Sequence, residues 1–294
     1  MKKLTILLLL LCVSLSAEAQ LLWKISGKDL TRPSYILGTH HVAPLSIIDS
    51  IKGFMPVMDE VEQVYGEVAA AEMQSPDIAA KMQKAVLLPQ GTTLQTLYTE
   101  EQYAQLNEGI SSLMGVDLKM LAQYKPAFIS AQISLILSMK SLKGFNPQQQ
   151  LDTWVQQEAT RRGKSTKGFE TVDFQTDLLF NAQTLERQAE QLYFLMTNVD
   201  LGVQQITDLS EAYMTQDLDN LAEIIQRKQN NASDPTPEEE EKLIYGRNVS
   251  WMKQMPEIMR QKATLFVVGS GHLVTERGLL ALLKKQGYTL EGIF

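Results

Sequence analysis

The residues best suited to chemistry in this chain are its three histidines, which all fall in two short motifs of the form G-x-x-H. The first motif is G-T-H-H at residues 38–41, and the second is G-S-G-H at residues 269–272. Each follows a short apolar run that is typical of a β-strand. Imidazole is the commonest neutral metal ligand and a frequent general base, so we expect the two strand ends to meet in one site.

Two acidic residues, Glu67 and Glu170, each stand at or just after the end of a further predicted strand. In open α/β sheets, ligands bind outside the carboxyl ends of the strands. Two imidazoles and one or two carboxylates suit a divalent transition metal with an open coordination position, which lowers the pKa of bound water and polarises a carbonyl. The candidate metal ligands are therefore His41, Glu67, Glu170 and His272. A carboxylate that is not a ligand could serve as general base.

Arg247 is a further candidate. It lies four residues before Trp251 in a predicted helix at 243–259, so the two side chains share one face of that helix. A guanidinium at this position could clamp a carboxylate or stabilise an oxyanion.

Each of these residues also has a structural interpretation. The histidines could be a satisfied structural pair, and His40 could be the ligand in place of His41, although the spacing shared with the second motif favours His41. Glu67 could be an exposed strand end, and Glu170 a solvated loop acid. Arg247 could form an ordinary salt bridge.

The elements that must position these residues lie at both ends of the chain. Apolar runs and turn signals predict strands at 22–25, 34–37, 63–68, 164–169, 264–268 and 288–293. The middle of the chain, about 75–260, is mostly helical, with one polar, acidic loop at 230–241. We therefore predict an α/β (α+β) fold in which a central mixed sheet is built from both chain ends and carries a large helical insertion.

Residues 1–19 have the features of a secretory signal peptide: two lysines, an apolar run at 4–15 and an A-x-A cleavage site. The mature protein is then a single domain at 20–294, periplasmic or secreted, with no membrane-spanning segment. Cys12 is the only cysteine and follows Leu11, where a lipoprotein signal would have a small residue. A chain without Cys12 can form neither a disulfide nor a cysteine metal site.

The charge of the mature chain excludes one class of partner. Removal of residues 1–19 leaves 25 basic and 33 acidic side chains, a net charge of −8. A moderately acidic protein without a basic cluster is a poor nucleic-acid binder, so we expect no nucleic-acid partner.

The order and spacing of several motifs resemble the TraB/PrgY/GumN family, which includes the Tiki metalloproteases. The matching segments are Y-I-L-G-T-H-H-V at 35–42, V-Y-G-E-V at 64–68, K-G-F-E at 167–170 followed by Gln175, R-N-x-x-W at 247–251 and V-V-G-S-G-H-L at 267–273. They extend over essentially the whole mature chain, and the secreted, GumN-like members are the most similar.

The resemblance implies a fold like that of the ChaN and erythromycin-esterase relatives and, from the Tiki members, metal-dependent proteolysis with manganese or cobalt. It implies that His41 and His272 are metal ligands and that Glu67 is the leading catalytic or ligand carboxylate. Glu170 and Arg247 would support them.

The leading hypothesis is a secreted metal-dependent hydrolase, a peptidase that acts on a peptide or protein through water activated by Mn²⁺, Co²⁺ or Zn²⁺. The alternative from another class is a non-catalytic protein that binds a peptide or small ligand in the same cleft. A third hypothesis is a hydrolase of non-peptide esters. Fold alone does not decide among them.

Overall fold

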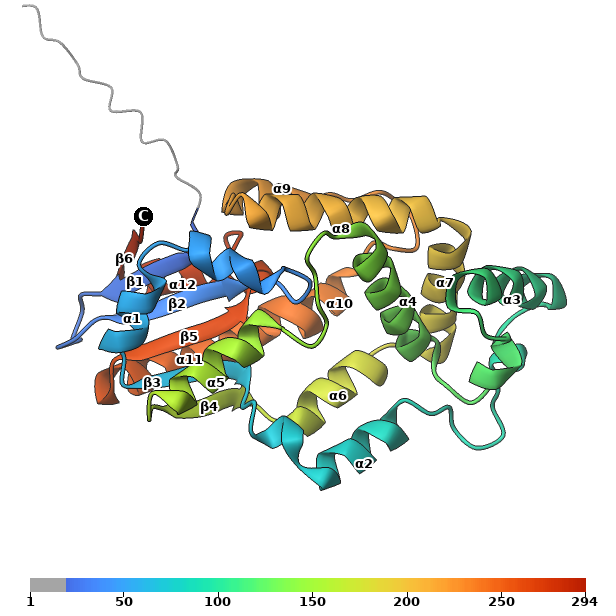
Figure 1. The fold of residues 1–294 in the computed structure, drawn as a ribbon, viewed down its shortest axis with the longest axis horizontal. Helices are drawn as coiled ribbons and strands as arrows, with labels where there is room; N and C mark the ends of the chain where they lie inside the picture. Colours follow the sequence, from blue (N-terminus) through green and yellow to red (C-terminus); the bar gives the residue numbers. More distant parts are fainter. Residues whose placement is uncertain (1–19) are drawn as a thin grey trace, which may run out of the picture.

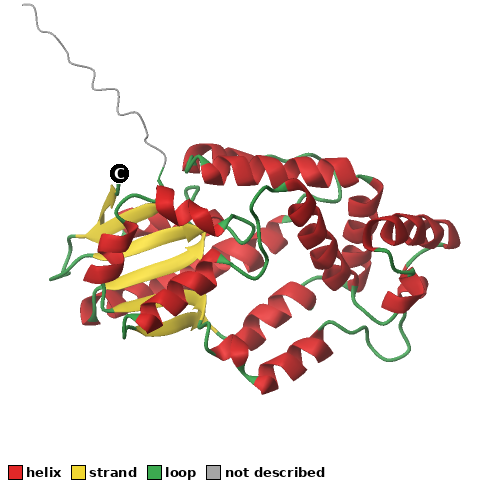
Figure 2. Ribbon diagram, viewed as in Figure 1, coloured by secondary structure: helices red, strands yellow, loops and turns green. Residues whose placement is uncertain are grey.

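The computed structural model describes residues 20–294, so the predicted signal peptide lies outside the described residues. Six strands form one sheet at one end of the molecule, and a group of helices extends from it (Figure 1, Figure 2). In chain order the strands are β1 (Leu22–Ser26), β2 (Ser34–Thr39), β3 (Gln63–Val68), β4 (Ser165–Glu170), β5 (Thr264–Gly269) and β6 (Thr289–Gly292). The prediction of an α/β fold with a mixed sheet built from both chain ends is confirmed.

The strand order in the sheet is β4-β3-β5-β2-β1-β6. The strands β4, β3, β5 and β2 run parallel, whereas β1 pairs antiparallel with both β2 and β6. The register places Gly38 beside Val268, and Gly66 between Val267 and Gly168. Because the four parallel strands share one direction, their carboxyl ends lie at the same edge, and both G-x-x-H motifs begin there.

Burial explains why these segments form strands. Every residue of β2 is buried, and so is every residue of β5 except the last. Near-continuous apolar runs are typical of parallel strands that are covered on both faces. The edge strand β4 is instead mostly exposed or half-buried, which accounts for its polar sequence.

Helices cover both faces of the sheet and continue beyond it. The α-helices are α1 (Phe54–Glu60), α2 (Pro76–Ala85), α3 (Glu100–Met114), α4 (Pro126–Ser141), α5 (Leu151–Arg161), α6 (Val172–Phe180), α7 (Leu185–Thr197), α8 (Val199–Met214), α9 (Leu218–Gln226), α10 (Pro237–Glu240), α11 (Gly246–Gln261) and α12 (Leu279–Lys285). A π-helical turn, η5 (Glu241–Tyr245), joins α10 to α11, and a 3₁₀ turn, η6 (Ser270–His272), follows β5. In Figure 1, α1 and α5 lie on one face of the sheet, and α11 and α12 on the other.

Local sequence signals fix several helix starts. Side chains accept a hydrogen bond from a backbone N–H in the first turn of the following helix at Thr99, Thr171, Thr184 and Asp217. The helical segment between β2 and β3 is divided at Gly53, which has φ 73° and separates a 3₁₀ turn, η1 (Leu45–Ser50), from α1. A left-handed conformation of this kind favours glycine.

Residues 20–294 form two apolar cores. One surrounds the sheet and includes Ile36, Phe266 and Trp251. The other lies among α3, α4 and α7, where Ile129 and Leu192 are buried, so the helical region has a core of its own. Within residues 20–294, no helix is long and apolar enough to cross a membrane.

Candidate active site

The predicted site residues come from the carboxyl edge of the parallel strands. His41 lies two residues after the end of β2, and Glu67 is the penultimate residue of β3. Glu170 ends β4, and His272 ends the turn η6 after β5. The helix α11 supplies Arg247 in its first turn. The strand-end argument thus accounts for how residues more than 200 positions apart reach one place.

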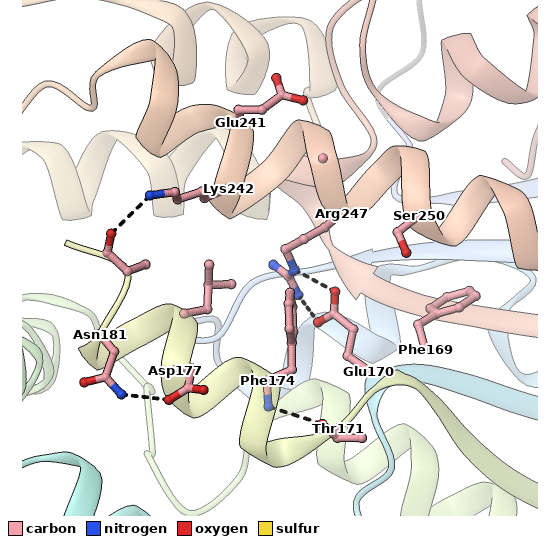
Figure 3. Close-up of a pocket in the computed structure, with 13 residues that line it drawn as sticks. Phe169, Glu170, Thr171, Phe174, Asp177, Asn181, Glu241, Lys242, Arg247 and Ser250 are labelled. Atoms are coloured by element: carbon pink, nitrogen blue, oxygen red, sulfur yellow. Dashed lines mark hydrogen bonds and ion pairs between the residues drawn. The ribbon is translucent and has the colours of Figure 1, made fainter.

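Arg247 is the centre of a buried cluster. Its Nη2 donates to Glu67 Oε2 at 2.5 Å and to Glu170 Oε2 at 2.8 Å, and its Nε donates to Glu170 Oε1 at 2.9 Å. Figure 3 shows the guanidinium paired with Glu170 beside a pocket. The Arg247 side chain is only 8% exposed, so its positive charge must be balanced inside the protein, and these two carboxylates balance it. The paired contacts also fix the orientation of the guanidinium.

The two carboxylates are held by further donors. Gln175 Nε2 lies 3.1 Å from Glu67 Oε2 and 3.1 Å from Glu170 Oε2, and it donates to both. Trp251 Nε1 donates to Glu170 Oε1 at 2.8 Å, and the backbone N–H of Gly269 donates to Glu67 Oε1 at 2.8 Å. Each of the four carboxylate oxygens therefore has at least one partner, as buried charges require.

The environment of Glu67 keeps it ionised. Burial raises its pKa, but Arg247 and the N–H of Gly269 hold the pKa below its usual value, and in acid the charge that His272 gains lowers it further. Glu67 Oε1 lies 3.9 Å from His272 Nε2. The carboxylate is thus a base placed beside an imidazole nitrogen.

His272 is neutral and has a defined tautomer. Burial lowers its pKa to about 4. Its Nε2 lies 3.0 Å from Arg247 Nη1, and because a guanidinium can only donate, Nε2 must accept. The proton is then on Nδ1, which donates to Asn248 Oδ1 at 2.7 Å. Asn248 is itself held by the bonds from its Nδ2 to the carbonyls of His272 and Arg277, at 3.2 and 3.0 Å.

His41 is oriented in a similar way by a different residue. Its Nδ1 lies 3.2 Å from Asp152 Oδ2, and the carboxylate of Asp152 also accepts a hydrogen bond from Thr39 Oγ1. The contact with Asp152 raises the pKa of His41 to about 9. The side chain of His41 is 67% exposed, so its Nε2 is accessible, and a metal ion that binds there displaces the proton that the ring carries at neutral pH. His40 instead packs its ring 5.3 Å from that of Tyr213, and burial lowers its pKa to about 4.

The π-helical turn η5 places Arg247 within the site. Arg247 follows this turn by two residues, and its Nη1 donates to the carbonyl of Leu243 within it at 3.0 Å. Gly246 permits the turn, because a Cβ there would lie 2.8 Å from the carbonyl oxygen of Glu241. Such π-turns are frequent at functional sites.

A pocket of about 1040 Å³ opens beside this cluster, between α6 and the segment formed by η5 and α11. Arg247 and Glu170 line it directly (Figure 3). A concave, largely apolar pocket beside groups with shifted pKa values is the usual form of a ligand site.

The donor atoms of the cluster fit a divalent metal in kind but not in their present arrangement. Within the described residues, no group of three or more His, Cys, Asp or Glu side chains is arranged to hold a metal ion. Arg247 Nη1 donates a hydrogen bond to His272 Nε2, and both oxygens of Glu170 accept hydrogen bonds from Arg247, so these three atoms already have a partner where a metal ion would bind. Two features nevertheless favour a cation: Nδ1 of His41 and of His272 each faces an oxygen acceptor, as in most metal-binding histidines, and two carboxylates outnumber one guanidinium.

The structure brings together Glu67, Glu170, His272 and Arg247, and places His41 with Asp152. Their roles as ligands and catalytic groups stay predictions. Sequence reasoning missed Asp152, which stands near the start of α5, where an acidic residue is ordinary and gives no signal of its own.

The sequence profile of the TraB/PrgY/gumN family matches residues 21–292. The chain belongs to this family. The match covers all six strands and every residue of the cluster, so the prediction made from the motifs is confirmed.

Among curated proteins, this TraB/PrgY/gumN member is similar to metalloprotease TIKI2 of Danio rerio, with 24% identity over 319 residues. It is also similar to metalloprotease TIKI1 of Xenopus tropicalis, with 24% identity over 311 residues. These matches cover 92% and 91% of this chain but only 60% of each relative, so the chain spans less than two thirds of their length. No solved structure matches the chain.

Proposed function

We propose that this protein is a metal-dependent hydrolase that cleaves peptide bonds at the Glu67–Arg247–His272 cluster. The observation that carries the proposal is the neutral His272, whose Nε2 faces an ionised, buried Glu67 and whose Nδ1 is held by Asn248. The distant similarity to two proteins named metalloproteases supports both the reaction class and a peptide or protein substrate.

The metal would be held by His41 and His272 through Nε2, and bound there it would supply Lewis-acid polarisation and an acidified water. Asp152 and Asn248 would keep the two rings in place, because each faces the Nδ1 of its histidine. The identity of the ion among Mn²⁺, Co²⁺ and Zn²⁺ belongs to this proposal.

Of the two roles predicted for Glu67, we assign that of general base. Its Oε1 is bonded only to the N–H of Gly269, so this oxygen has a lone pair free to accept a proton from an attacking water. Its Oε2, by contrast, accepts from both Arg247 and Gln175. We assign Glu170 to holding Arg247, since both of its oxygens are taken by donors.

Arg247 is suited to stabilising the oxyanion of the tetrahedral intermediate. Its Nη1 donates to His272 and to the carbonyl of Leu243, whereas its other nitrogens are fixed by carboxylates. Withdrawal of Nη1 from His272 would direct this N–H toward a substrate oxygen beside the imidazole. Glu170, which Gln175 and Trp251 hold by hydrogen bonds, would keep the guanidinium in place during that movement.

We also infer that the protein acts outside the cytoplasm, in the periplasm or beyond. The support is the lysine-bearing, apolar segment at 1–19 with its A-x-A motif. Fractionation of cells that express the full chain, with N-terminal sequencing of the product, tests this inference; full-length protein retained in the cytoplasm contradicts it.

A second candidate function is a non-catalytic binding protein. The observation in its favour is that Arg247 covers Nε2 of His272, which closes the cluster as it stands. Such a protein would retain a peptide in the pocket without forming product.

Turnover separates the two functions. Wild type, Glu67→Gln and the control Glu291→Gln, a strand carboxylate that is 61% exposed, are each incubated with a peptide library and Mn²⁺, Co²⁺ or Zn²⁺. We expect wild type and Glu291→Gln to form products, and Glu67→Gln to lose at least about a hundredfold in kcat/KM. If all three proteins bind peptide and none of them forms product, the result would support the binding protein instead.

A further inference from the structure

The size and lining of the pocket beside Arg247 indicate the kind of ligand that it could bind. Its volume of about 1040 Å³ is enough for several residues of a peptide, and α6 forms one wall. The opposite wall is formed by η5 and the start of α11. A substrate lying between these walls would present a bond to the cluster at the Arg247 side of the pocket.

Phe174 is a large apolar side chain that lines the pocket and is exposed to solvent. It is 47% exposed although it is large and apolar, and Figure 3 shows its ring directed from α6 toward Arg247. Leu178 also lines the pocket, and it lies four residues further along α6, so the two side chains share a face. Phe169 also borders the pocket, but its ring is buried against Trp251 and Phe266, so the exposed apolar surface comes from α6. Covering that surface with a ligand is favourable, because it removes apolar area from water.

The charged residues on the α11 side of the pocket already have partners. Lys242 pairs with Glu238 at 2.8 Å, and Glu241 pairs with Arg277 at 2.6 Å. A charged side chain of a substrate would have to compete with these pairs.

The charged residue on the α6 side is partnered as well. Asp177 Oδ1 accepts from Asn181 Nδ2 at 2.7 Å, and Asn181 Oδ1 accepts from the ammonium of Lys125. Asn181 thus links Asp177 to a cation. The described lining therefore offers apolar contact but no unpaired charge, which favours an uncharged, apolar guest.

We propose that this pocket binds a large apolar side chain of a peptide beside the bond presented to the cluster, and that Phe174 determines this preference. The assignment rests on the proposed function for the meaning of that bond. The binding preference itself can be measured without turnover.

The probes are three blocked tripeptides, acetyl-Ala-X-Ala-amide, in which X is Phe, Asp or Lys. Their affinities are measured by titration calorimetry or NMR on proteins that all carry Glu67→Gln, so that no peptide is consumed. Phe174→Ala is compared with Leu179→Ala, a matched control because Leu179 is on the same helix, is 58% exposed and does not line the pocket. Thermal melts confirm that both variants fold.

We expect the Phe peptide to bind most tightly, Phe174→Ala to weaken it by about tenfold, and Leu179→Ala to leave it unchanged. Equal affinity for the three peptides, or an unchanged affinity in Phe174→Ala, would overturn the assignment. Protein without Glu67→Gln is then tested for hydrolysis of the same peptides. Selective binding of the Phe peptide without cleavage would contradict the proposed function but not the preference assigned to the pocket. Cleavage of the three peptides at equal rates would contradict that preference alone.

Discussion

Nη1 of Arg247 lies 3.0 Å from Nε2 of His272, and Nε2 is the nitrogen through which this histidine would bind a metal. A guanidinium cannot accept a hydrogen bond, so the contact fixes the imidazole as an Nδ1–H tautomer with its lone pair directed into the cluster. Arg247 and a metal ion would therefore compete for one lone pair. The competition gives Arg247 two separable effects, one on metal affinity and one on catalysis.

Arg247→Ala should move these two effects in opposite directions. Removal of the guanidinium frees Nε2 of His272 and leaves Glu67 and Glu170 without their cation, so metal affinity should rise. Loss of the oxyanion donor should lower kcat by about a hundredfold or more. Metal titration and peptide hydrolysis measure the two quantities, with Arg277→Ala, whose side chain is 54% exposed, as the control. A fall in metal affinity in Arg247→Ala would show that the guanidinium does not compete.

Asn248 should control the affinity of the site for metal through the orientation of His272. Asn248→Ala removes the acceptor for Nδ1–H, and we expect a tenfold to hundredfold loss of metal affinity, about the effect found for such outer residues. Asn248→Asp keeps an oxygen at this position and should restore part of the affinity. Equal affinities in the two variants would exclude an orienting role.

Gly246 should be required for the π-helical turn that places Arg247. In Gly246→Ala the new Cβ meets the carbonyl oxygen of Glu241 at 2.8 Å, so the helix must shift or lose the turn. We expect a loss of about 1–3 kcal/mol in the free energy of unfolding, together with reduced activity. Urea denaturation measures the first effect, and Gln254→Ala on the exposed side of α11, away from the pocket, is the control. Wild-type stability and activity in Gly246→Ala would contradict this role.

The ion pairs at the end of α5 should make stability depend on pH in the acid range. Hydrogen bonds from Arg161 and Arg162 lower the pKa of Glu158 from 4.5 to about 2. A folded-state pKa below the unfolded value means that this carboxylate stabilises the fold above about pH 4.5 and loses its effect as the pH falls toward 2. The difference in Tm between wild type and Glu158→Gln should therefore be largest near pH 7 and vanish near pH 2. A difference that stays constant across this range would contradict the assignment.

Much of the fold follows from local sequence patterns. The apolar runs at 34–37 and 264–268 predict the buried central strands, because parallel strands covered on both faces have no polar side to show. The rule that ligands bind at the carboxyl ends of such strands then brings Glu67 and His272 together from opposite ends of the chain.

Other features depend on contacts that no local pattern encodes. Asp152 reaches His41 across 111 positions of the chain, and Gln175 reaches Glu67 across 108, so each looks like an ordinary polar helix residue until the fold forms. The polar, acidic composition of the segment at 230–241 predicts a loop, and this prediction is wrong at the end of the segment. In the structure, a capping box at Thr236 begins α10, and Glu239 pairs with Arg187.

The most direct test of the central claim is the metal content of the mature protein, purified without a histidine tag and reconstituted with Mn²⁺, Co²⁺ or Zn²⁺. Mass spectrometry compares wild type with the double variant His41→Ala/His272→Ala. A metal hydrolase at this cluster predicts close to one ion per chain in wild type and loss of that ion in a double variant that still folds. No bound metal in wild type, or equal metal in both proteins, would contradict the proposed site.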